Sequence, residues 1–316
     1  MAAVLIKDFK NISKSDTLIA WWKWASLGEM TKAGIPVPQG FVILSNVFDM
    51  FVSETGLDIK IDAILKSLDM KKEQTIETAS KKIKTMILAK EIPWYIKESI
   101  LENYKKLNAK FVAVRSSATA EDSASTARAG QLESYLNVTE KTLLNDIKKC
   151  WASLFTPRAI FYRFENRLTK DSISVAVVIQ KMVDSEKSGI AFSVHPVTED
   201  RNQIIIEAWF GLGEAIVSGE ITPDSYIIDK RKYNILEINV NEQSKALYKK
   251  PWGGNERKKL KEKGKTQVLN SKEIIELSEI IVKIERHYGF PCDIERAKEW
   301  NNFYIVQSRP ITTLTR

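Results

Sequence analysis

Residues 292–310 read CDIERAKEWNNFYIVQSRP, and they predict a β-hairpin near the end of the chain. The segment reads as two strands around a turn at Asn301 and Asn302, because asparagine tolerates the positive φ angles of a tight turn. In a strand, residues two apart share a face. The register of this hairpin therefore decides which of its side chains lie together.

A turn centred near Asn301 places Glu295 opposite Gln307 and Asp293 opposite Arg309, so these four side chains would line one face. Carboxylate and amide oxygens suit Mg²⁺, and a guanidinium suits the paired oxygens of a phosphate. The spacing therefore indicates a metal and phosphate site. A salt-bridge ladder across an exposed hairpin explains the same pattern, and spacing alone does not separate the two interpretations.

Length and composition indicate a large globular protein. The chain has 316 residues, of which 44% are hydrophobic and 28% are charged, which excludes a disordered or collagen-like chain and predicts about two lobes. Cys150 and Cys292 form no CxxC pair, so we expect a reducing compartment and no structural zinc. The sequence has no apolar run long enough to span a membrane and no signal-peptide pattern, so we expect a cytoplasmic protein.

The order of the predicted elements favours an α+β fold. Helical periodicity covers residues 59–107, 139–167 and 271–287, and Ser271 is the expected cap of the last helix. A short strand at 111–114 runs into Arg115, which would stand at the strand's end beside a small-residue loop, as in a phosphate cradle. Thr119 and Asp122 in that loop also fit an N-cap pair, and taken alone their pattern favours capping. Further strands are expected at 41–44, 175–180, 189–193, 204–209, 226–229 and 235–238.

Basic residues are concentrated in residues 245–265 of a chain whose formal net charge is +8. We expect this segment to be a solvated loop followed by the start of a helix. It contains no ladder of aromatic side chains and no recognition motif, so the sequence does not favour nucleic-acid binding.

Five segments, in this order, resemble the nucleotide-binding domain of the phosphoenolpyruvate synthase and pyruvate phosphate dikinase family. They cover most of the chain: LGEMTKAGIPVPQGFVI at 27–43, VAVRSSATAEDSASTARAGQLESYLNV at 112–138, VIQKMVDSEKSGIAFSVHPVT at 178–198, FGLGEAIVSGEITPDSYI at 210–227 and FYIVQSRPITTL at 303–314. The resemblance implies an ATP-grasp fold with two lobes and a cleft between them, and it implies binding of ATP with Mg²⁺. The expected lobes are residues 1–183, with the phosphate-binding segments and a hinge strand, and residues 184–316, with the metal-binding hairpin.

The resemblance also implies roles for single residues. Those expected to contact the nucleotide are Lys23, Arg115, Gly130, Ser134, Gln180, Met182, Val183, Asp184 and Arg309. Lys23 and Arg115 would hold phosphates, the backbone from Gln180 to Val183 would meet adenine, and Asp184 would lie near the ribose. Glu295 and Gln307 would bind Mg²⁺. Lys23 and Arg309 are the expected catalytic residues, with Arg309 on the transferring phosphate.

The family passes a phosphoryl group from ATP to a histidine on a second domain, and then to pyruvate in a third. Neither His195 nor His287 lies in a motif like that of the carrier histidine. The resemblance therefore implies an isolated nucleotide domain, whose partners would be the phosphohistidine and pyruvate domains. Whether residues 1–316 alone are an enzyme stays open at this point.

The sequence departs from the family where glycines normally surround the phosphates. The usual glycine-rich stretch reads Trp21-Trp22-Lys23-Trp24, and a tryptophan fills space that a glycine leaves for a phosphate. This favours an alternative in which a diverged or engineered scaffold no longer binds ATP and instead binds a protein or itself. The interaction patch would consist of Trp21, Trp22, Trp24, Trp209, Trp300, Arg128 and Arg296, since tryptophan and arginine dominate protein interfaces.

Overall fold

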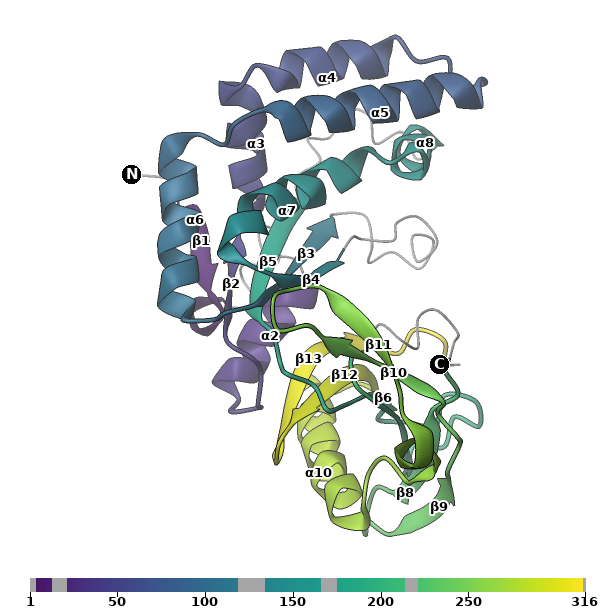
Figure 1. Ribbon diagram of the computed structural model, residues 1–316. Coiled ribbons are helices and arrows are strands. Elements are labelled where there is room, and N and C mark those ends of the chain that lie inside the picture. The colour runs from purple at the N-terminus through teal and green to yellow at the C-terminus, as the bar shows by residue number, and fades with distance from the viewer. Residues whose placement is uncertain (1–3, 13–21, 119–133, 166–174, 214–220, 315–316) are drawn as a thin grey trace. The chain divides into compact units, whose positions relative to one another are not determined.

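A computed structural model describes residues 4–12, 22–118, 134–165, 175–213 and 221–314 of this chain. It divides into two compact units, and Figure 1 labels most of their helices and strands. Unit 1 comprises residues 1–25 and 39–182, and unit 2 comprises residues 26–38 and 183–316. The division after Met182 lies beside the boundary expected after residue 183, while residues 26–38 join the later unit.

The sheet of unit 1 has five described strands, all antiparallel to their neighbours, in the order β1-β2-β5-β3-β4. The strands are β1 (Ile6–Asp8), β2 (Gly40–Ile43), β3 (Val112–Ala118), β4 (Ser134–Val138) and β5 (Val175–Lys181). β3 extends beyond the predicted end at Val114, because it pairs with β5 as far as Ala118 opposite Val175. Arg115 therefore lies in the middle of a strand, and its expected place at a strand end is wrong.

The other regular elements described in unit 1 are helices, and aromatic side chains from several of them meet in its core. The elements are η1 (Phe9–Asn11), α3 (Ser45–Glu54), α4 (Leu57–Lys66), α5 (Glu73–Ala89), α6 (Trp94–Leu107), α7 (Glu140–Ala152), η3 (Ser153–Phe155) and α8 (Pro157–Glu165). Trp151 of α7 is fully buried and stacks on Phe51 of α3 with ring centroids 4.9 Å apart. The helix predicted over 139–167 is thus interrupted, since a 3-10 turn separates α7 from α8.

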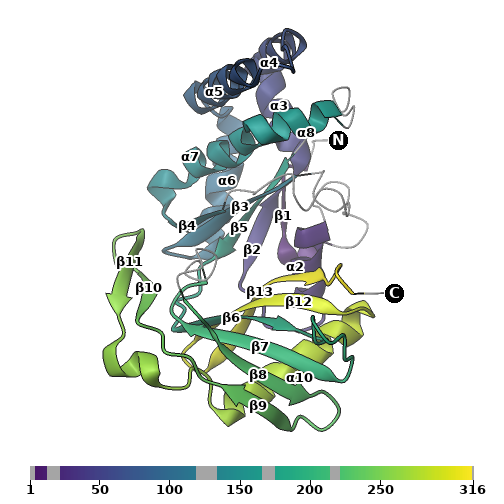
Figure 2. The same cartoon turned by 90° about the vertical axis from the view of Figure 1, so that its right-hand side faces the viewer.

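The main sheet of unit 2 has six described strands, also antiparallel, in the order β13-β12-β6-β7-β8-β9 (Figure 2). They are β6 (Lys187–Phe192), β7 (Gln203–Phe210), β8 (Asp224–Asp229), β9 (Ile235–Asn239), β12 (Cys292–Glu299) and β13 (Asn302–Pro310). The helix α10 (Ser271–Tyr288) packs against β12. The helix α2 (Trp22–Lys32) begins in unit 1 and continues into unit 2. These helices and sheets confirm the predicted α+β class.

Helix α10 begins one residue earlier than its predicted cap allows. Asn270 is the N-cap, and its side chain accepts a hydrogen bond from the backbone N–H of Glu273. The Glu273 carboxylate returns a bond to the backbone N–H of Asn270, which completes a capping box. The predicted cap, Ser271, is the first residue of the helix, and Asn270 outcompetes it because Glu273 then occupies the reciprocal position.

The basic segment 245–265 forms a β-hairpin instead of the expected loop and helix start. Its strands are β10 (Lys245–Lys249) and β11 (Asn255–Lys259), which are followed by the 3-10 turn η5 (Lys261–Lys265). Gly253 and Gly254 both adopt positive φ angles, 108° and 75°, in the turn between the strands. These strands were not predicted, because strand prediction depends on alternating apolar and polar residues and charged side chains hide that alternation here.

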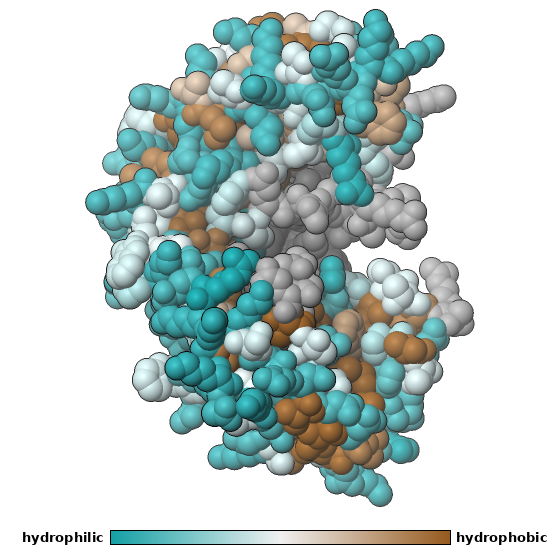
Figure 3. Space-filling view, turned by 45° about the vertical axis from the view of Figure 1, so that its right-hand side comes forward, coloured by the Kyte–Doolittle hydropathy of each residue, from teal (hydrophilic) through white to brown (hydrophobic). Residues whose placement is uncertain are grey.

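Charged and polar side chains cover much of the molecular surface in Figure 3, where apolar side chains gather over strands of unit 2. The exposed apolar residues of the outer strand β9 and its end are Leu236, Ile238 and Val240. No helix in the described part of the chain is long and apolar enough to cross a membrane.

Candidate functional site

The hairpin β12–β13 has the predicted pairing at the residues that matter for chemistry. Glu295 lies opposite Gln307, and Asp293 lies opposite Arg309. The turn falls between Glu299 and Asn302, half a residue before the predicted centre, and a bulge then leaves Val306 between the partners of Arg296 and Glu295. Because the bulge adds one residue to β13, it restores the predicted register.

Asp293 fixes the orientation of the Arg309 guanidinium. Both Nε and a terminal nitrogen of Arg309 lie 2.8 Å from Oδ2 of Asp293, whose side chain is largely buried. The Arg309 side chain is 51% exposed, so the guanidinium remains accessible from solvent. This arrangement explains why the pattern fits both of the original interpretations: an ion pair across the hairpin also presents an oriented guanidinium next to two oxygen ligands.

Glu207 of β7 is a further carboxylate on the same face of the sheet, and the sequence analysis missed it. Cross-strand pairing runs from Gln307 through Glu295 and Ile190 to Glu207. Burial raises the pKa of Glu207, and the negative charge of Asp293 raises it further. Its position as the one charged residue within Ile204–Phe210 is the sequence signal that could have found it.

The donor set of this face fits a hard cation. Glu295 and Gln307 are half-buried, and their side chains offer carboxylate and amide oxygens, the ligands that Mg²⁺ prefers. Within the described ranges, no cluster of three or more His, Cys, Asp or Glu side chains could hold a metal ion by itself. Mg²⁺ commonly keeps few protein ligands and completes its octahedron with water and substrate phosphates. Two adjacent oxygen ligands match that mode of binding.

In unit 1, the structure brings two predicted phosphate-binding residues together. Arg115 of β3 pairs directly with Ser134, the first residue of β4, and with Val178 of β5 on its other side. The Arg115 side chain is half-buried and Ser134 is exposed. The predicted site residues Trp21, Arg128 and Gly130 lie outside the described part of the chain, as do the side chains of Trp22, Lys23 and Trp24.

The segment expected to meet adenine is the end of β5 and the residues after it. Gln180 is buried in the middle of the sheet, opposite Ala113 and Gly40. The backbone N–H of Met182 donates to the carbonyl of Phe111, at 3.1 Å, and the carbonyl of Val183 accepts from the N–H of Ser185, at 2.9 Å. These two backbone groups are therefore engaged within their own units.

Asp184 is exposed and forms an ion pair within unit 2. Its Oδ2 lies 3.0 Å from Nζ of Lys249 on β10, a residue of the basic segment 245–265 to which the sequence analysis gave no role of its own. No local pattern could have found this pair, because its members are far apart in the sequence.

The predicted interaction patch is wrong at two of its residues, Trp209 and Arg296, because both side chains are buried. Trp209 is 2% exposed, and its indole N–H donates to the carbonyl of Leu212. Arg296 is 1% exposed, donates to the carbonyl of Glu207, and lies 5.7 Å from the ring centroid of Phe303. Burial lowers the pKa of Arg296 to about 10. Side chains this deeply packed cannot contribute to a surface patch.

Trp300, the remaining described tryptophan of that patch, is 75% exposed and occupies the hairpin turn. Its φ angle is 52°, so the left-handed residue is the tryptophan and not the asparagines that the sequence suggested. A side chain in this conformation costs about 1–2 kcal/mol relative to right-handed backbone.

We expect Trp300→Gly to stabilise unit 2 by about 0.5–1 kcal/mol, since glycine adopts this conformation without strain and an exposed indole contributes little packing. Chemical denaturation measures the change. Trp252→Gly is the matched control, because Trp252 is similarly exposed, at 80%, but is not among the described residues with positive φ. A loss of stability in Trp300→Gly would show that the indole makes a stabilising contact.

The end of the hairpin is held by a network of charges. The Glu273 carboxylate accepts hydrogen bonds from Lys187 at 2.8 and 2.9 Å, and lies 3.2 Å from Nζ of Lys298 on β12. Burial alone would raise the pKa of Glu273, but Lys187, the backbone N–H of Asn270 and Lys298 together hold it below its ordinary value. The capping box of α10 is thus tied to β6 and β12 through one carboxylate.

Comparison with known proteins decides what kind of domain carries these residues. A family model described as pyruvate phosphate dikinase, AMP/ATP-binding domain, matches residues 22–316. The chain belongs to this family. The match begins at Trp22, the first residue of α2. Membership confirms the resemblance of the five segments and the assignment of the α+β fold to the ATP-grasp class.

Relatives of this AMP/ATP-binding domain are longer proteins. The chain is 44% identical over 312 residues to a probable phosphoenolpyruvate synthase of Archaeoglobus fulgidus, covering 97% of the chain and 41% of the relative. The identity is 42% over 314 residues for a probable phosphoenolpyruvate synthase of Methanocaldococcus jannaschii, with 97% and 26% covered. For the phosphoenolpyruvate synthase of Pyrococcus furiosus it is 38% over 362 residues, with 99% and 44% covered. The chain spans less than half the length of these relatives.

Proposed function

We propose that this chain binds ATP with Mg²⁺ and acts as the phosphoryl-donating domain of a phosphoenolpyruvate-forming system. The observation that carries the proposal is the cross-strand pair of Glu295 and Gln307 beside the Asp293-oriented guanidinium of Arg309. It lies in a chain that belongs to an AMP/ATP-binding family and is similar to phosphoenolpyruvate synthases. A ladder of ion pairs across the hairpin would not need an uncharged amide, that of Gln307, opposite Glu295.

On the hairpin, Glu295 and Gln307 would hold Mg²⁺, which when bound neutralises charge on the triphosphate. Arg309 binds a phosphate oxygen and stabilises the negative charge that shifts among the phosphate oxygens during transfer. Asp293 keeps the guanidinium in place, so that little reorganisation is needed when the phosphate arrives. Glu207, two strands away on the same face, offers a further carboxyl oxygen toward a bound cation.

In unit 1, Arg115 and Ser134 would contact phosphates from adjacent strands, and this assignment is supported by their direct pairing. Lys23 and Gly130 complete the proposed phosphate-binding set. A guanidinium binds two phosphate oxygens with parallel hydrogen bonds, and a serine hydroxyl donates one more. In this assignment Arg115 and Lys23 would supply positive charge to the triphosphate, and the Ser134 hydroxyl would supply a neutral hydrogen-bond donor.

Adenine recognition would use the backbone after β5. With the Met182 N–H and the Val183 carbonyl engaged by protein partners, either the Met182 carbonyl or the Val183 N–H would meet the base. These two groups belong to one trans peptide and point in opposite directions, so only one of them can contact the edge of adenine. Gln180 supports this segment from inside the sheet, and Asp184 would accept hydrogen bonds from the ribose hydroxyls.

The proposed partners are a domain that carries the phosphohistidine and a domain that binds pyruvate, in agreement with the greater length of the relatives. The alternative of a tryptophan-rich binding surface is less well supported, because among its described side chains Trp209 and Arg296 are buried and Trp300 alone is exposed. MgATP binding is therefore the function that the described residues support best.

Calorimetric titration of the chain with MgATP tests the proposal, with MgGTP and Mg²⁺ alone as comparison ligands. We expect one binding site, a preference for ATP over GTP, and no phosphoenolpyruvate when residues 1–316 alone are incubated with MgATP and pyruvate, because no histidine here lies in a carrier motif. The proposal is rejected if MgATP fails to bind at millimolar concentration.

A further inference from the structure

The ion pair of Asp184 and Lys249 joins the segment proposed to meet the nucleoside with a hairpin that has no assigned role. Asp184 has a side chain that is 61% exposed, whereas that of Lys249 is only 17% exposed. The lysine therefore lies in a fixed environment and the carboxylate is open to solvent. A partly buried ammonium is screened less by water than an exposed one, so it orients its partner more strongly.

Lys249 reaches this position because β10 is anchored to the main sheet of unit 2. The N–H of Leu212 donates to the carbonyl of Leu247 at 2.8 Å, two residues before Lys249. Gly211 forms a bridge with Leu247 and has a φ angle of 80°. A Cβ atom on Gly211 would stand 2.3 Å from the Leu247 carbonyl oxygen, so only glycine permits this approach.

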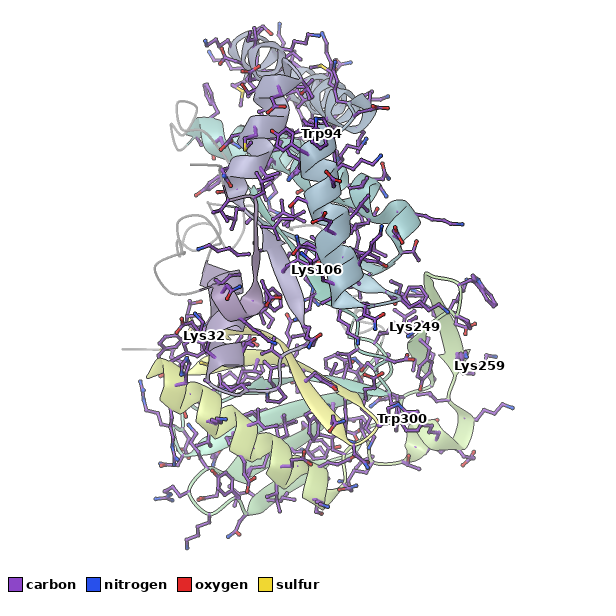
Figure 4. The ribbon with its side chains drawn as sticks, turned by 90° about the vertical axis from the view of Figure 1, so that its left-hand side faces the viewer. Lys32, Trp94, Lys106, Lys249, Lys259 and Trp300 are labelled. Carbon is purple, nitrogen blue, oxygen red and sulfur yellow. The ribbon has the colours of Figure 1, made fainter. Side chains whose placement is uncertain are left out.

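The same Gly211 also anchors the segment that carries Asp184. Its N–H donates to the carbonyl of Glu186 at 2.8 Å, and its carbonyl accepts from the hydroxyls of Ser188, at 2.6 Å, and Ser185, at 3.3 Å. Asp184 and Lys249 are thus both held within a few residues of one glycine. Lys249 and Lys259 lie on the two strands of the β10–β11 hairpin (Figure 4), which provides a matched pair of lysines for comparison.

We propose that Lys249 is a positioning residue that holds the Asp184 carboxylate in the orientation that binds the ribose hydroxyls of the nucleotide. The inference rests on the proposed function and adds a residue that determines sugar specificity. A carboxylate can accept about four hydrogen bonds, so one ammonium at Oδ2 leaves acceptor capacity for two hydroxyls. Without Lys249, the exposed carboxylate rotates freely and must lose that freedom whenever the nucleotide binds.

The test compares ATP with 2′,3′-dideoxy-ATP, which lacks both ribose hydroxyls, in calorimetric titrations with Mg²⁺. We expect the unmodified chain to bind ATP more tightly than dideoxy-ATP. Lys249→Met should lower the affinity for ATP about 10-fold and change the affinity for dideoxy-ATP less than about 2-fold. Asp184→Asn should reduce the same preference, and Lys249→Arg should restore most of it. Lys259→Met is the control, because Lys259 is exposed on the same hairpin and should leave both affinities unchanged.

The outcomes separate this inference from the function on which it rests. If the unmodified chain binds no ATP, the proposed function fails and the role of Lys249 fails with it. If it binds ATP, the inference alone is overturned by either of two results for Lys249→Met. One is an equal loss of affinity for both nucleotides, which would place Lys249 on the base or the phosphates. The other is an unchanged preference in a variant whose thermal unfolding matches that of the unmodified chain.

Discussion

Glu295→Ala should weaken binding of ATP in the presence of Mg²⁺ by about 100-fold, since the loss of a charged ligand is worth roughly 3 kcal/mol. Binding of ATP in excess chelator should change little, because the carboxylate acts through the cation. Glu295 is half-buried on a strand that pairs on both sides, so the variant keeps the hairpin's backbone hydrogen bonds. Calorimetric titration of the folded variant measures both affinities.

Glu237→Ala is the matched control for this variant, because Glu237 is an exposed glutamate on the edge strand β9 of the same sheet. It should bind MgATP as the unmodified chain does. Equal weakening in the presence and absence of Mg²⁺ would contradict the metal role of Glu295. It would point instead to a general loss of structure in the hairpin, which circular dichroism of the variant would detect.

Asp224→Ala should destabilise unit 2 by roughly 3–5 kcal/mol, because removing one buried carboxylate leaves several donors without partners. Asp224 is completely buried. It accepts hydrogen bonds from the backbone N–H groups of Val268 and Asn241, at 2.8 and 3.0 Å, and from the Tyr226 hydroxyl, at 2.9 Å. Burial also raises the pKa of Tyr226, so its hydroxyl stays protonated and continues to donate.

The stability change is read from urea unfolding, monitored separately from nucleotide binding. Glu242→Ala serves as the control, since Glu242 is exposed in the loop next to Asn241. Its free energy of unfolding should lie within about 0.5 kcal/mol of the unmodified chain, as for most surface substitutions. A comparably small effect of Asp224→Ala would mean that water replaces the carboxylate, and that the network does not hold the loops to β8.

The pairing of Glu295 with Gln307 was predicted correctly although the turn lies half a residue before its predicted centre, because the bulge in β13 compensates for that offset. The turn conformation of the hairpin could not be predicted, since the chain places the positive φ angle at Trp300 although two asparagines follow. The start of α10 differed by one residue because Asn270 and Ser271 are both good caps, and Glu273 decides between them. Local sequence patterns thus predicted the hairpin and the helix correctly, but they did not predict which of two neighbouring residues forms the turn or the cap.

Long-range contacts lay beyond sequence reasoning altogether. The burial of Arg296 depends on the absence of a side chain at Gly189, where a Cβ atom would stand 2.3 Å from the guanidinium. The hairpin of residues 245–265 depends on Gly211 as its anchor, and the Asp184–Lys249 pair depends on both. Each of these features needs two distant segments in contact, and no periodicity within either segment encodes that contact.

The central claim is that the face of the β12–β13 hairpin holds the metal of a metal–nucleotide complex, and Mn²⁺ substitution tests it most directly. Electron paramagnetic resonance measures free Mn²⁺ in titrations of the chain with ATP present. The account predicts a tight Mn²⁺ site that requires ATP and is lost in both Glu295→Ala and Gln307→Ala, but is retained in Glu237→Ala. Retention of the same ATP-dependent Mn²⁺ site in both hairpin variants would contradict the account.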